Sequence, residues 1–347
     1  MRAAVLSSYK EPLEFTEVED PEPPPTGAVV RVTAVGVCHS DLHLRRGELQ
    51  DLVPMDLPTI LGHEITGRIE ALGAAASGPA VGTDVLVYPP VSCGGCRTCL
   101  RGSAHMCATA SWLGVGRPGG CADLVAVPRA DRQLIPLDGL SPLEAAPLAD
   151  AALTSYRAVR KVAPRLRPDG ALVIIGLGGL AQYAVQLARL CTPAVIVVCV
   201  RRVAQRAGRA RALGADTVID LDDADAAAKL RAACPGGAAD AVLDVVGVCS
   251  TMEFAAAALA PGGQLVVVGS MLGQIPFGWA CAPFEASFTT SFWGSLSELH
   301  DVLALAHRGL LRADLVTYPL DRIEQAHTDL ADGRIPGRAV LLPHGQP

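Results

Sequence analysis

Short apolar runs alternate with helical patterns between residues 171 and 269, and this alternation constrains the fold more than any other feature. The runs have the length of strands and cover 171–176, 194–200, 217–220, 241–246 and 264–269. Helical patterns lie between them at 180–190, 203–213, 224–233 and 251–259. Apolar strands that alternate with helices form a parallel sheet covered on both faces. We therefore expect a doubly wound α/β domain over 152–297.

The first 151 residues have a different texture. Short β-type runs at 29–38, 67–72, 84–88 and 121–127 are separated by proline and glycine, which predicts an irregular, strand-rich domain. After residue 297 the sequence predicts two helices and a last strand, which could close either domain; they cover 297–311, 321–331 and 338–342. A chain of 347 residues is long enough for two domains.

Charge and apolar content exclude several classes of partner. The net charge of -6 gives no general attraction to nucleic acid or to anionic membranes. The N-terminus lacks the apolar stretch of a signal peptide, and the longest apolar runs are too short to cross a bilayer. We expect a cytoplasmic protein that acts on a small molecule. Its eleven cysteines are then metal ligands or buried thiols, because that compartment disfavours structural disulfides.

Four of these cysteines lie close together, at Cys93, Cys96, Cys99 and Cys107. Zinc prefers four thiolates in a tetrahedron, and a site with four protein ligands leaves no position for substrate. The segment between the thiols is polar and contains glycine, so metal binding would supply its folding energy. The spacing predicts a structural zinc site. The alternatives are unconnected reduced cysteines or a disulfide pair.

A glycine-rich turn follows the first apolar run of the α/β half and opens a helix. Strand, glycine turn and helix in this order place backbone N–H groups against a pyrophosphate. Gly176 permits the tight turn and Gly178 the close approach of phosphate. The alternative is a tight turn without a ligand. The residues expected to bind a dinucleotide here and in the last two runs are Gly176, Gly178, Gly179, Leu180, Val246 and Val268.

The end of the second run indicates which nicotinamide cofactor binds. A carboxylate there would bind the 2′-hydroxyl of NAD and repel a 2′-phosphate. The sequence has Arg201 and Arg202 instead, and guanidinium groups suit a phosphate. We therefore expect NADP(H), with NAD(H) as a second possibility. The alternative is that both arginines are solvated charges at the start of an arginine-rich helix.

A second set of metal ligands lies at the ends of predicted strands. Cys38, His63 and Glu64 offer a thiolate, an imidazole and a carboxylate, and Asp150 is a further ligand just before the α/β half. A catalytic zinc needs three protein ligands and one open position. Taken singly, Cys38 and His63 are more often buried structural residues.

Five motifs in this order give the chain a specific resemblance. They are Gly36–His43, Gly62–Glu64, the four-cysteine segment, Thr154–Val159 and Gly176–Leu180. Together they resemble the zinc-dependent medium-chain alcohol dehydrogenases, in particular bacterial secondary-alcohol dehydrogenases, along essentially the whole chain. The resemblance implies a GroES-like catalytic domain over 1–151 with a zinc lobe near 90–110, a Rossmann domain over 152–297 and a return to the catalytic domain over 298–347. It also implies a homotetramer or homodimer.

The resemblance assigns roles to individual residues. Cys38, His63 and Asp150 match the catalytic zinc ligands, with Asp150 where many members have cysteine, and Glu64 matches an alternative ligand. Asp41 matches the carboxylate that orients the ligand histidine. The residues matching the proton relay are Ser40 and His43.

The implied enzyme carries two zinc ions, one catalytic and one structural. It transfers hydride reversibly between an alcohol and a nicotinamide cofactor, with zinc polarising the substrate oxygen. One alternative is reduction of an imine or activated alkene, which would not need the Ser40 and His43 relay. Another is a nucleotide-binding protein without catalysis, for which loss of a ligand would be the sign.

The substrate is less defined than the reaction. Trp112 and Trp293 are candidates for the substrate pocket, where they would suit an apolar secondary alcohol or an aryl ketone. They could equally be core residues of a domain interface.

Overall fold

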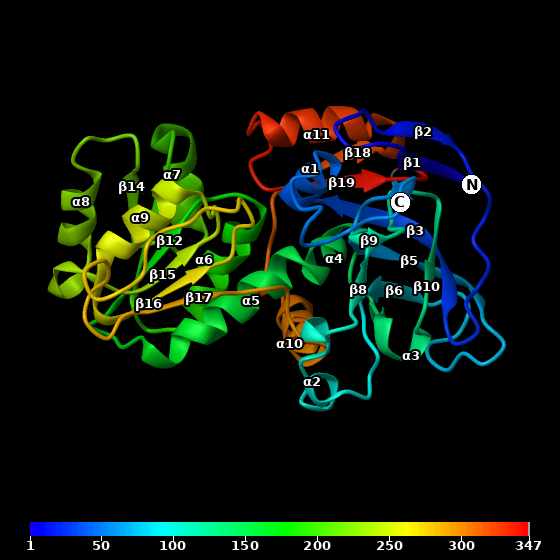
Figure 1. Cartoon of the computed structure of the whole chain (residues 1–347), viewed down its shortest axis with the longest axis horizontal. Helices are drawn as coiled ribbons and strands as arrows, with labels where there is room; N and C mark the ends of the chain where they lie inside the picture. Colours follow the sequence, from blue (N-terminus) through cyan, green and yellow to red (C-terminus); the bar gives the residue numbers. More distant parts are fainter. Residues whose placement is uncertain (346–347) are drawn as a thin grey trace. The chain divides into compact units, whose positions relative to one another are not determined.

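The computed structural model describes residues 1–345, which form two compact units. The first comprises Met1–Asp150 and the chain from Gly294 onward, and the second comprises Ala151–Trp293. Figure 1 shows the first in blue, cyan and red and the second mainly in green and yellow. The return segment therefore starts four residues before the expected 298. Residues 346 and 347, at its predicted end, lie outside the described residues.

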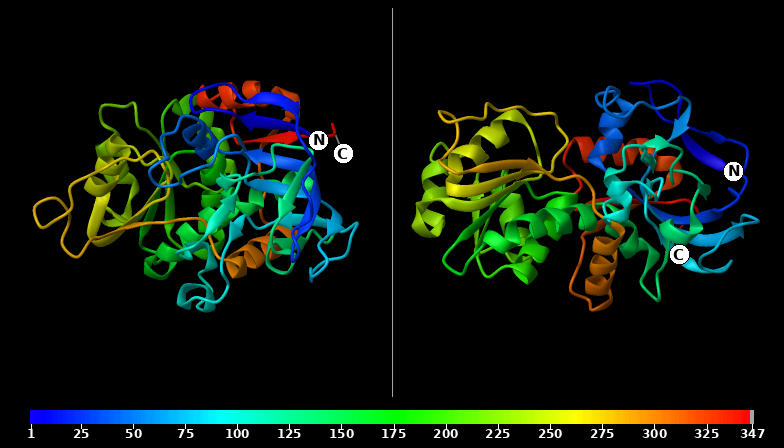
Figure 2. Two further views of the ribbon diagram at one scale, coloured as in Figure 1. Left: turned by 45° about the vertical axis from the view of Figure 1, so that its right-hand side comes forward. Right: turned by 60° about the horizontal axis from the view of Figure 1, so that its bottom comes forward.

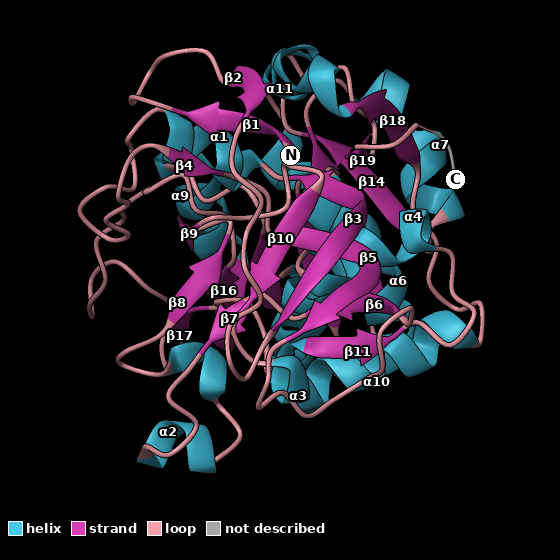
Figure 3. Ribbon diagram, turned by 90° about the vertical axis from the view of Figure 1, so that its right-hand side faces the viewer, coloured by secondary structure: helices cyan, strands magenta, loops and turns pink. Residues whose placement is uncertain are grey.

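The largest sheet of the first unit has seven strands (Figure 3). Its order is β11-β6-β5-β3-β19-β18, and β10 also pairs with β3. Every pair is antiparallel except β18 with β19. The strands are β3 (Ala28–Val37), β5 (Glu64–Leu72), β6 (Asp84–Val87), β10 (Leu124–Val127), β11 (Leu134–Pro136), β18 (Leu315–Pro319) and β19 (Arg338–Leu342). This sheet places the site described below, because β3 and β5 pair at its centre.

Two three-stranded sheets and several short helices complete the first unit. The small strands are β1 (Arg2–Leu6), β2 (Glu14–Glu17), β4 (Thr59–Ile60), β7 (Pro90–Val91), β8 (Ser111–Leu113) and β9 (Gly116–Arg117). The helices are α1 (His39–Arg45), α2 (Arg97–Leu100), η1 (Ala104–Met106), α3 (Ala130–Gln133), α4 (Pro142–Ala145), η2 (Ala146–Ala149), α10 (Leu296–His307), η5 (Leu320–Arg322) and α11 (Ile323–Ala331). Ser295 begins α10 with a capping box, since its hydroxyl accepts from the Glu298 N–H and the Glu298 carboxylate accepts from the Ser295 N–H.

The second unit is built on a six-stranded parallel sheet in the order β14-β13-β12-β15-β16-β17. This is the doubly wound order, in which the direction of winding reverses between the first and fourth strands. The strands are β12 (Ala171–Ile175), β13 (Val195–Val200), β14 (Thr217–Asp220), β15 (Ala239–Asp244), β16 (Leu259–Val267) and β17 (Ser287–Thr290). The expected fold class, a strand-rich domain with a doubly wound α/β domain, is confirmed.

Helices cover both faces of this sheet, and contacts pair α5 with α6 and α8 with α9. They are α5 (Ala151–Val162), η3 (Ala163–Arg165), α6 (Gly179–Cys191), α7 (Val203–Ala212), α8 (Ala226–Ala233), η4 (Pro235–Gly237) and α9 (Cys249–Ala258). Every residue of β12 is buried, as expected for a central strand with helices on both faces. The apolar runs of the sequence thus supply the sheet and the core between its helices.

The sequence prediction missed several elements, among them α5, β17 and β18. Nine of the twelve residues of α5 are buried, including the polar Thr154 and Ser155, so apolar residues alone do not mark its buried face. β17 and β18 are short strands of mixed polarity at the edges of their sheets, where burial imposes no alternation. Among the described residues, no helix combines the length and apolar character needed to cross a membrane.

Candidate active site and metal centres

Three predicted ligands come together within the first unit. Cys38 directly follows β3, His63 directly precedes β5, and Asp150 follows η2. Because β3 and β5 run antiparallel with Gly36 opposite Glu64, the end of one strand lies beside the start of the other. One ligand atom from each of Cys38, His63 and Asp150 lies within 4.8 Å of the other two. The register of one strand pair therefore brings together ligands that are far apart in the sequence.

The separations of these atoms match a tetrahedral zinc site. Asp150 Oδ2 lies 3.6 Å from Cys38 Sγ and 3.4 Å from His63 Nε2. Zinc bonds of about 2.3 Å to sulfur and 2.0–2.2 Å to nitrogen and oxygen, at tetrahedral angles, give ligand separations of about 3.6 and 3.4 Å. A thiolate, an imidazole and a carboxylate are also ligands that zinc accepts. The three residues thus fit three corners of a zinc tetrahedron.

Asp41 and Ser40 lie on opposite sides of the His63 ring. Asp41 Oδ1 is 3.3 Å from His63 Nδ1, and Asp41 Oδ2 accepts from the Cys38 N–H at 2.8 Å. Ser40 Oγ lies 3.4 Å from Nε2, the nitrogen that faces Asp150. Burial alone would lower the pKa of His63, but the Asp41 charge and the Asp150 hydrogen bond raise it well above its usual value. The arrangement fixes which ring nitrogen of His63 faces Cys38 and Asp150.

His43 lies on α1 with Ser40 and Asp41. Its side chain is buried, and its Nδ1 contacts the carboxylate of Glu48, whose side chain is 43% exposed. A path of polar groups therefore leads from the buried helix to a solvent-exposed carboxylate. Glu48 had not been identified in the sequence.

Glu64 was expected as an alternative metal ligand, but its carboxylate binds an arginine instead. It belongs to β5, is fully buried, and forms a two-point ion pair with Arg338 of β19, at 2.8 Å to Nε and 2.5 Å to Nη2. Arg338 Nη2 also lies 3.3 Å from Asp150 Oδ2. Glu64 is not in the group formed by Cys38, His63 and Asp150. Arg338 thus connects the carboxylate predicted as an alternative ligand with the carboxylate in the group.

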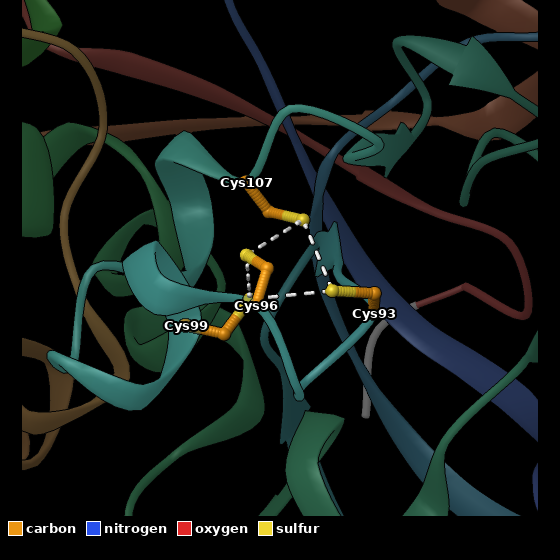
Figure 4. Close-up of side chains that lie close together, drawn as sticks. All are labelled: Cys93, Cys96, Cys99 and Cys107. Atoms are coloured by element: carbon orange, nitrogen blue, oxygen red, sulfur yellow. Dashed lines mark hydrogen bonds between the residues drawn. The ribbon is translucent and has the colours of Figure 1, made fainter.

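The four clustered cysteines converge in the lobe around α2 and η1, as Figure 4 shows. Their sulfur atoms are separated by 3.5 to 3.9 Å, too far for a disulfide, and all four thiols are free. A tetrahedron with zinc–sulfur bonds of about 2.3 Å has edges of about 3.8 Å. The cluster therefore fits one zinc ion held by four thiolates.

The lobe also stabilises the ionised form of two of its thiols. A hydrogen bond from the Thr109 hydroxyl lowers the pKa of Cys107 to about 6, and the backbone N–H groups of Gly95 and Cys96 lower that of Cys93. Burial raises the pKa of Cys99 to about 11. Gly94 adopts a φ of +72°, which suits the tight turn between Cys93 and Cys96.

The glycine turn has the form expected of a dinucleotide site. Gly176 follows β12 with a φ of +104°, and a Cβ there would crowd Val245 and Val246. Gly178 caps α6 in an extended conformation, and a Cβ on it would meet only open space. Gly179 and Leu180 form the first turn of α6, whose N–H groups point outward. The backbone conformation of this turn and the open space beside Gly178 fit a pyrophosphate.

Arg201 and Arg202 follow β13 but differ in their contacts. The Arg201 Nε donates to Asp222 Oδ1 at 2.9 Å, and the Arg201 side chain is 77% exposed. Arg202 caps α7 with a φ of 57°, and its backbone N–H contacts Asp222 Oδ2 at 3.3 Å. Asp222 lies just beyond β14, the neighbour of β13. The missing carboxylate at the end of β13 is therefore partly replaced by one from the next strand.

The other predicted residues lie in both units. Val246 and Val268 follow β15 and β16, and the buried Asp244 accepts from the Val246 N–H at 2.9 Å and the Gly247 N–H at 3.0 Å. Trp112 lies half-buried in β8 of the first unit, whereas Trp293 is buried at the end of the second. Trp293 packs edge-on against Phe292.

Three functional candidates escaped the sequence analysis: Arg338, Glu48 and Asp222. Arg338 had one detectable signal, because it begins a strand that is otherwise wholly apolar. A charge in such a strand indicates a buried partner. Glu48 and Asp222 lie in segments rich in charge, and only the folded chain distinguishes them from ordinary surface carboxylates.

Comparisons with known proteins agree with this geometry. Residues 24–139 match the family "Alcohol dehydrogenase GroES-like domain", and residues 179–308 match the family "Zinc-binding dehydrogenase". An NAD-dependent alcohol dehydrogenase of Sulfurisphaera tokodaii is 35% identical, with 99% of this chain and 100% of the relative covered. D-arabinose 1-dehydrogenase (NADP(+)) of Saccharolobus solfataricus is 33% identical over 99% of this chain and 97% of the relative.

The solved structures point the same way. The alcohol dehydrogenase of the archaeon Aeropyrum pernix superimposes with a TM-score of 0.93 at 34% identity, covering 99% of this chain and 100% of that one. The match extends over both units. The chain belongs to the zinc-dependent medium-chain alcohol dehydrogenases, enzymes of alcohol oxidoreduction with a nicotinamide cofactor.

Proposed function

We propose that Cys38, His63 and Asp150 hold the catalytic zinc at which this enzyme oxidises an alcohol or reduces a ketone or aldehyde. The observation that carries the proposal is that Asp150 Oδ2 lies at tetrahedral separations from Cys38 Sγ and His63 Nε2, with all three ligand atoms within 4.8 Å of one another. Zinc bound there would polarise a substrate oxygen and lower the pKa of a hydroxyl. Three protein ligands leave the fourth position for that oxygen.

We assign the proton path to Ser40 and His43. The Ser40 hydroxyl lies beside His63 Nε2, so it borders the position that a substrate oxygen would occupy. His43 follows one turn later on α1 and contacts Glu48, which is open to solvent. Ser40 can accept the substrate proton, and His43 with Glu48 can carry a proton to water. Asp41 acts through His63, which it orients.

We assign a second, structural zinc to Cys93, Cys96, Cys99 and Cys107, which makes two zinc ions per chain. The similar sulfur separations and the lowered pKa of Cys107 support this assignment. The site has four protein ligands and no position for substrate. Its role is to hold the lobe between β7 and β8.

The cofactor is NADP(H) in preference to NAD(H). Support comes from the arginines that follow β13 where a carboxylate would select NAD. One relative is named for NADP(+) and another for NAD, so relatives of both kinds share this fold. We expect NADPH to bind more tightly than NADH by at least about tenfold, the value of one charge-assisted hydrogen bond. Equal affinities would contradict the assignment.

The substrate is an apolar secondary alcohol or the matching aryl ketone, with Trp112 and Trp293 as pocket residues. Bulky aromatic side chains favour substrates of that kind by apolar contact. Trp112→Ala should raise the KM for an aryl ketone more than that for acetone. Equal changes would mean that Trp112 is only a core residue.

The chain works in the cytoplasm and associates with copies of itself as a dimer or tetramer. Thiols that must stay reduced to bind zinc favour a reducing compartment. Within residues 1–345, β17 leaves one edge of its sheet without a partner strand, and the loop before it exposes Phe277, Trp279 and Phe284. This loop projects from the sheet in both views of Figure 2. Light scattering should report a dimer or tetramer, and Trp279→Ser should weaken the association between the copies.

One experiment tests the catalytic proposal. Oxidation of NADPH is followed with aryl ketones and aldehydes, and with imines and enones of matched shape, before and after chelation. We expect carbonyl reduction that stops when zinc is removed and returns when zinc is added, with metal analysis giving two zinc ions per chain. Turnover that survives complete removal of zinc, or reduction of imines or enones alone, would overturn it.

A further inference from the structure

Three arginines share one face of α7. Arg202 caps the helix, and Arg206 and Arg209 follow at intervals of four and three residues. Residues at this spacing lie one above another on the same side of a helix. The helix therefore carries a stripe of guanidinium groups.

One end of the stripe reaches the glycine turn. Arg209, at its far end, donates from Nη1 to the Leu177 carbonyl of the turn at 3.3 Å and from Nη2 to Gln182 Oε1 on α6 at 2.8 Å. Arg202, at its near end, directly follows Arg201 after β13. Arg206 therefore lies between the glycine turn and the end of the second strand. A dinucleotide places the ribose of its adenosine between these two points.

Two members of the stripe, Arg202 and Arg206, keep side chains that can bind an anion, although the Arg202 backbone N–H contacts Asp222. Within residues 1–345, neither Arg202 nor Arg206 forms an ion pair with a carboxylate. Arg206 is half-buried, and its burial together with the charges of Arg202 and Arg209 lowers its pKa. Guanidinium groups that repel one another gain stability when an anion binds between them.

Arg201 has a different electrostatic environment. It is exposed and paired with Asp222, whose pKa is lowered mainly by the Arg201 hydrogen bond, so the carboxylate remains ionised near neutral pH. A phosphate that approached Arg201 would also approach this negative charge. Asp222 therefore makes Arg201 a poorer phosphate ligand than its position in the sequence indicates.

We propose that Arg206, together with Arg202, receives the 2′-phosphate of NADP(H), while Asp222 holds Arg201 in an ion pair outside that contact. The proposal rests on the preference for NADP(H) proposed above and assigns it to a residue that the sequence motif does not include. A guanidinium group suits the role because its donors can reach two phosphate oxygens at once.

Two small ligands isolate the contact from catalysis. Adenosine 2′,5′-bisphosphate and 5′-AMP differ only in the 2′-phosphate. The dissociation constant of 5′-AMP divided by that of the bisphosphate therefore measures how strongly the enzyme recognises this phosphate. Isothermal calorimetry on the zinc-loaded enzyme should give tighter binding of the bisphosphate. Arg206→Ala should reduce this ratio by at least about tenfold, as loss of a charge-assisted hydrogen bond implies. Arg211→Ala, on the same helix but outside the stripe, should leave the ratio unchanged.

Two further variants test the role of Asp222. Arg201→Ala should change the ratio by less than about threefold, the range of an exposed ion pair. Asp222→Asn frees Arg201 and removes a negative charge, so it should raise the ratio. A larger loss in Arg201→Ala than in Arg206→Ala would overturn the inference and leave the cofactor preference intact.

Other outcomes also separate the two proposals. Equal weakening of both ligands in Arg206→Ala would make Arg206 a structural residue and overturn the inference. A wild-type enzyme that binds the two ligands equally would overturn the cofactor preference itself. Arg206→Lys keeps the charge but not the paired donors, so it should restore only part of the ratio.

Discussion

The first unit contains two groups of zinc ligands that differ in how the chain delivers them. The four thiols lie within fifteen residues, on one short lobe that has little apolar core of its own. Cys38, His63 and Asp150 span more than a hundred residues and are set in place by the register of β3 and β5. In the first group, metal binding supplies the energy that folds the segment. In the second group, the folded sheet places the ligands before the metal binds. Removing a ligand should therefore have opposite consequences in the two groups.

The largest effect is expected for catalysis in Cys38→Ser. Loss of the metal's action on the substrate oxygen removes several kcal/mol of transition-state stabilisation, about 10³-fold or more in kcat. NADPH affinity and the melting temperature should change little, because β3 and β5 fold without the metal. Stopped-flow kinetics, calorimetry and thermal melts measure the three quantities. A parallel loss of cofactor binding would make Cys38 structural and remove the contrast between the two groups.

The next largest effect is expected for the stability of the fold when Arg338 is replaced. Arg338→Met leaves the buried Glu64 without its ion-pair partner, which should cost about 3–5 kcal/mol in the free energy of unfolding. Urea unfolding measures it. The double variant Arg338→Met with Glu64→Gln should recover much of the loss, because no buried charge remains. Failure of this rescue would show that Arg338 acts mainly through Asp150.

In the lobe, Cys99→Ser should release one zinc ion per chain and open the segment 93–107 to proteases. Metal binding supplies the folding energy of such segments. The kcat per folded molecule should stay within about twofold, since no lobe thiol borders the proposed substrate position. Metal analysis with limited proteolysis tests this prediction. A collapse of kcat with the catalytic zinc still bound would show that the two groups are coupled.

The smallest effect concerns a carboxylate outside both groups. Burial alone would raise the pKa of Asp123, but hydrogen bonds from the side chain and backbone of Arg2 outweigh it and lower the pKa. The ion pair therefore stabilises the fold above the unfolded pKa near 3.9, and its contribution disappears as pH falls through the lower folded value.

Asp123→Asn should destabilise the protein by about 1 kcal/mol at pH 7, with allowance for the exposed Arg2 side chain. The difference from wild type should shrink below about pH 4. Chemical unfolding across this range measures it, and zinc content should not change. A difference that persists unchanged at pH 3 would contradict the assigned ionisation.

Sequence patterns predicted the α/β domain well because its strands are buried on both faces. The run at 217–220 and the last strand at 338–342 match β14 and β19 residue for residue. Helix α5 was missed because its buried face includes the polar Thr154 and Ser155 as well as apolar residues. The four-thiol group could also be predicted, because its ligands lie close together in the sequence.

Pairings across the fold could not be predicted in the same way. The ion pair of Glu64 with Arg338 joins residues 274 positions apart, and only the placement of β19 beside β3 brings them together. Likewise, Asp222 meets Arg201 because β14 pairs with β13. Such contacts follow from sheet order, which a single sequence does not state.

Asp150 is the last residue of the first unit, and Ala151 begins the second. The chain passes between the units twice, and the first of the two joining peptide bonds starts at a residue of the ligand group. Chimeric enzymes that exchange nucleotide-binding units between relatives must join the parental sequences after this aspartate. A junction placed even a few residues earlier would import the other parent's ligand and change the metal chemistry along with the cofactor.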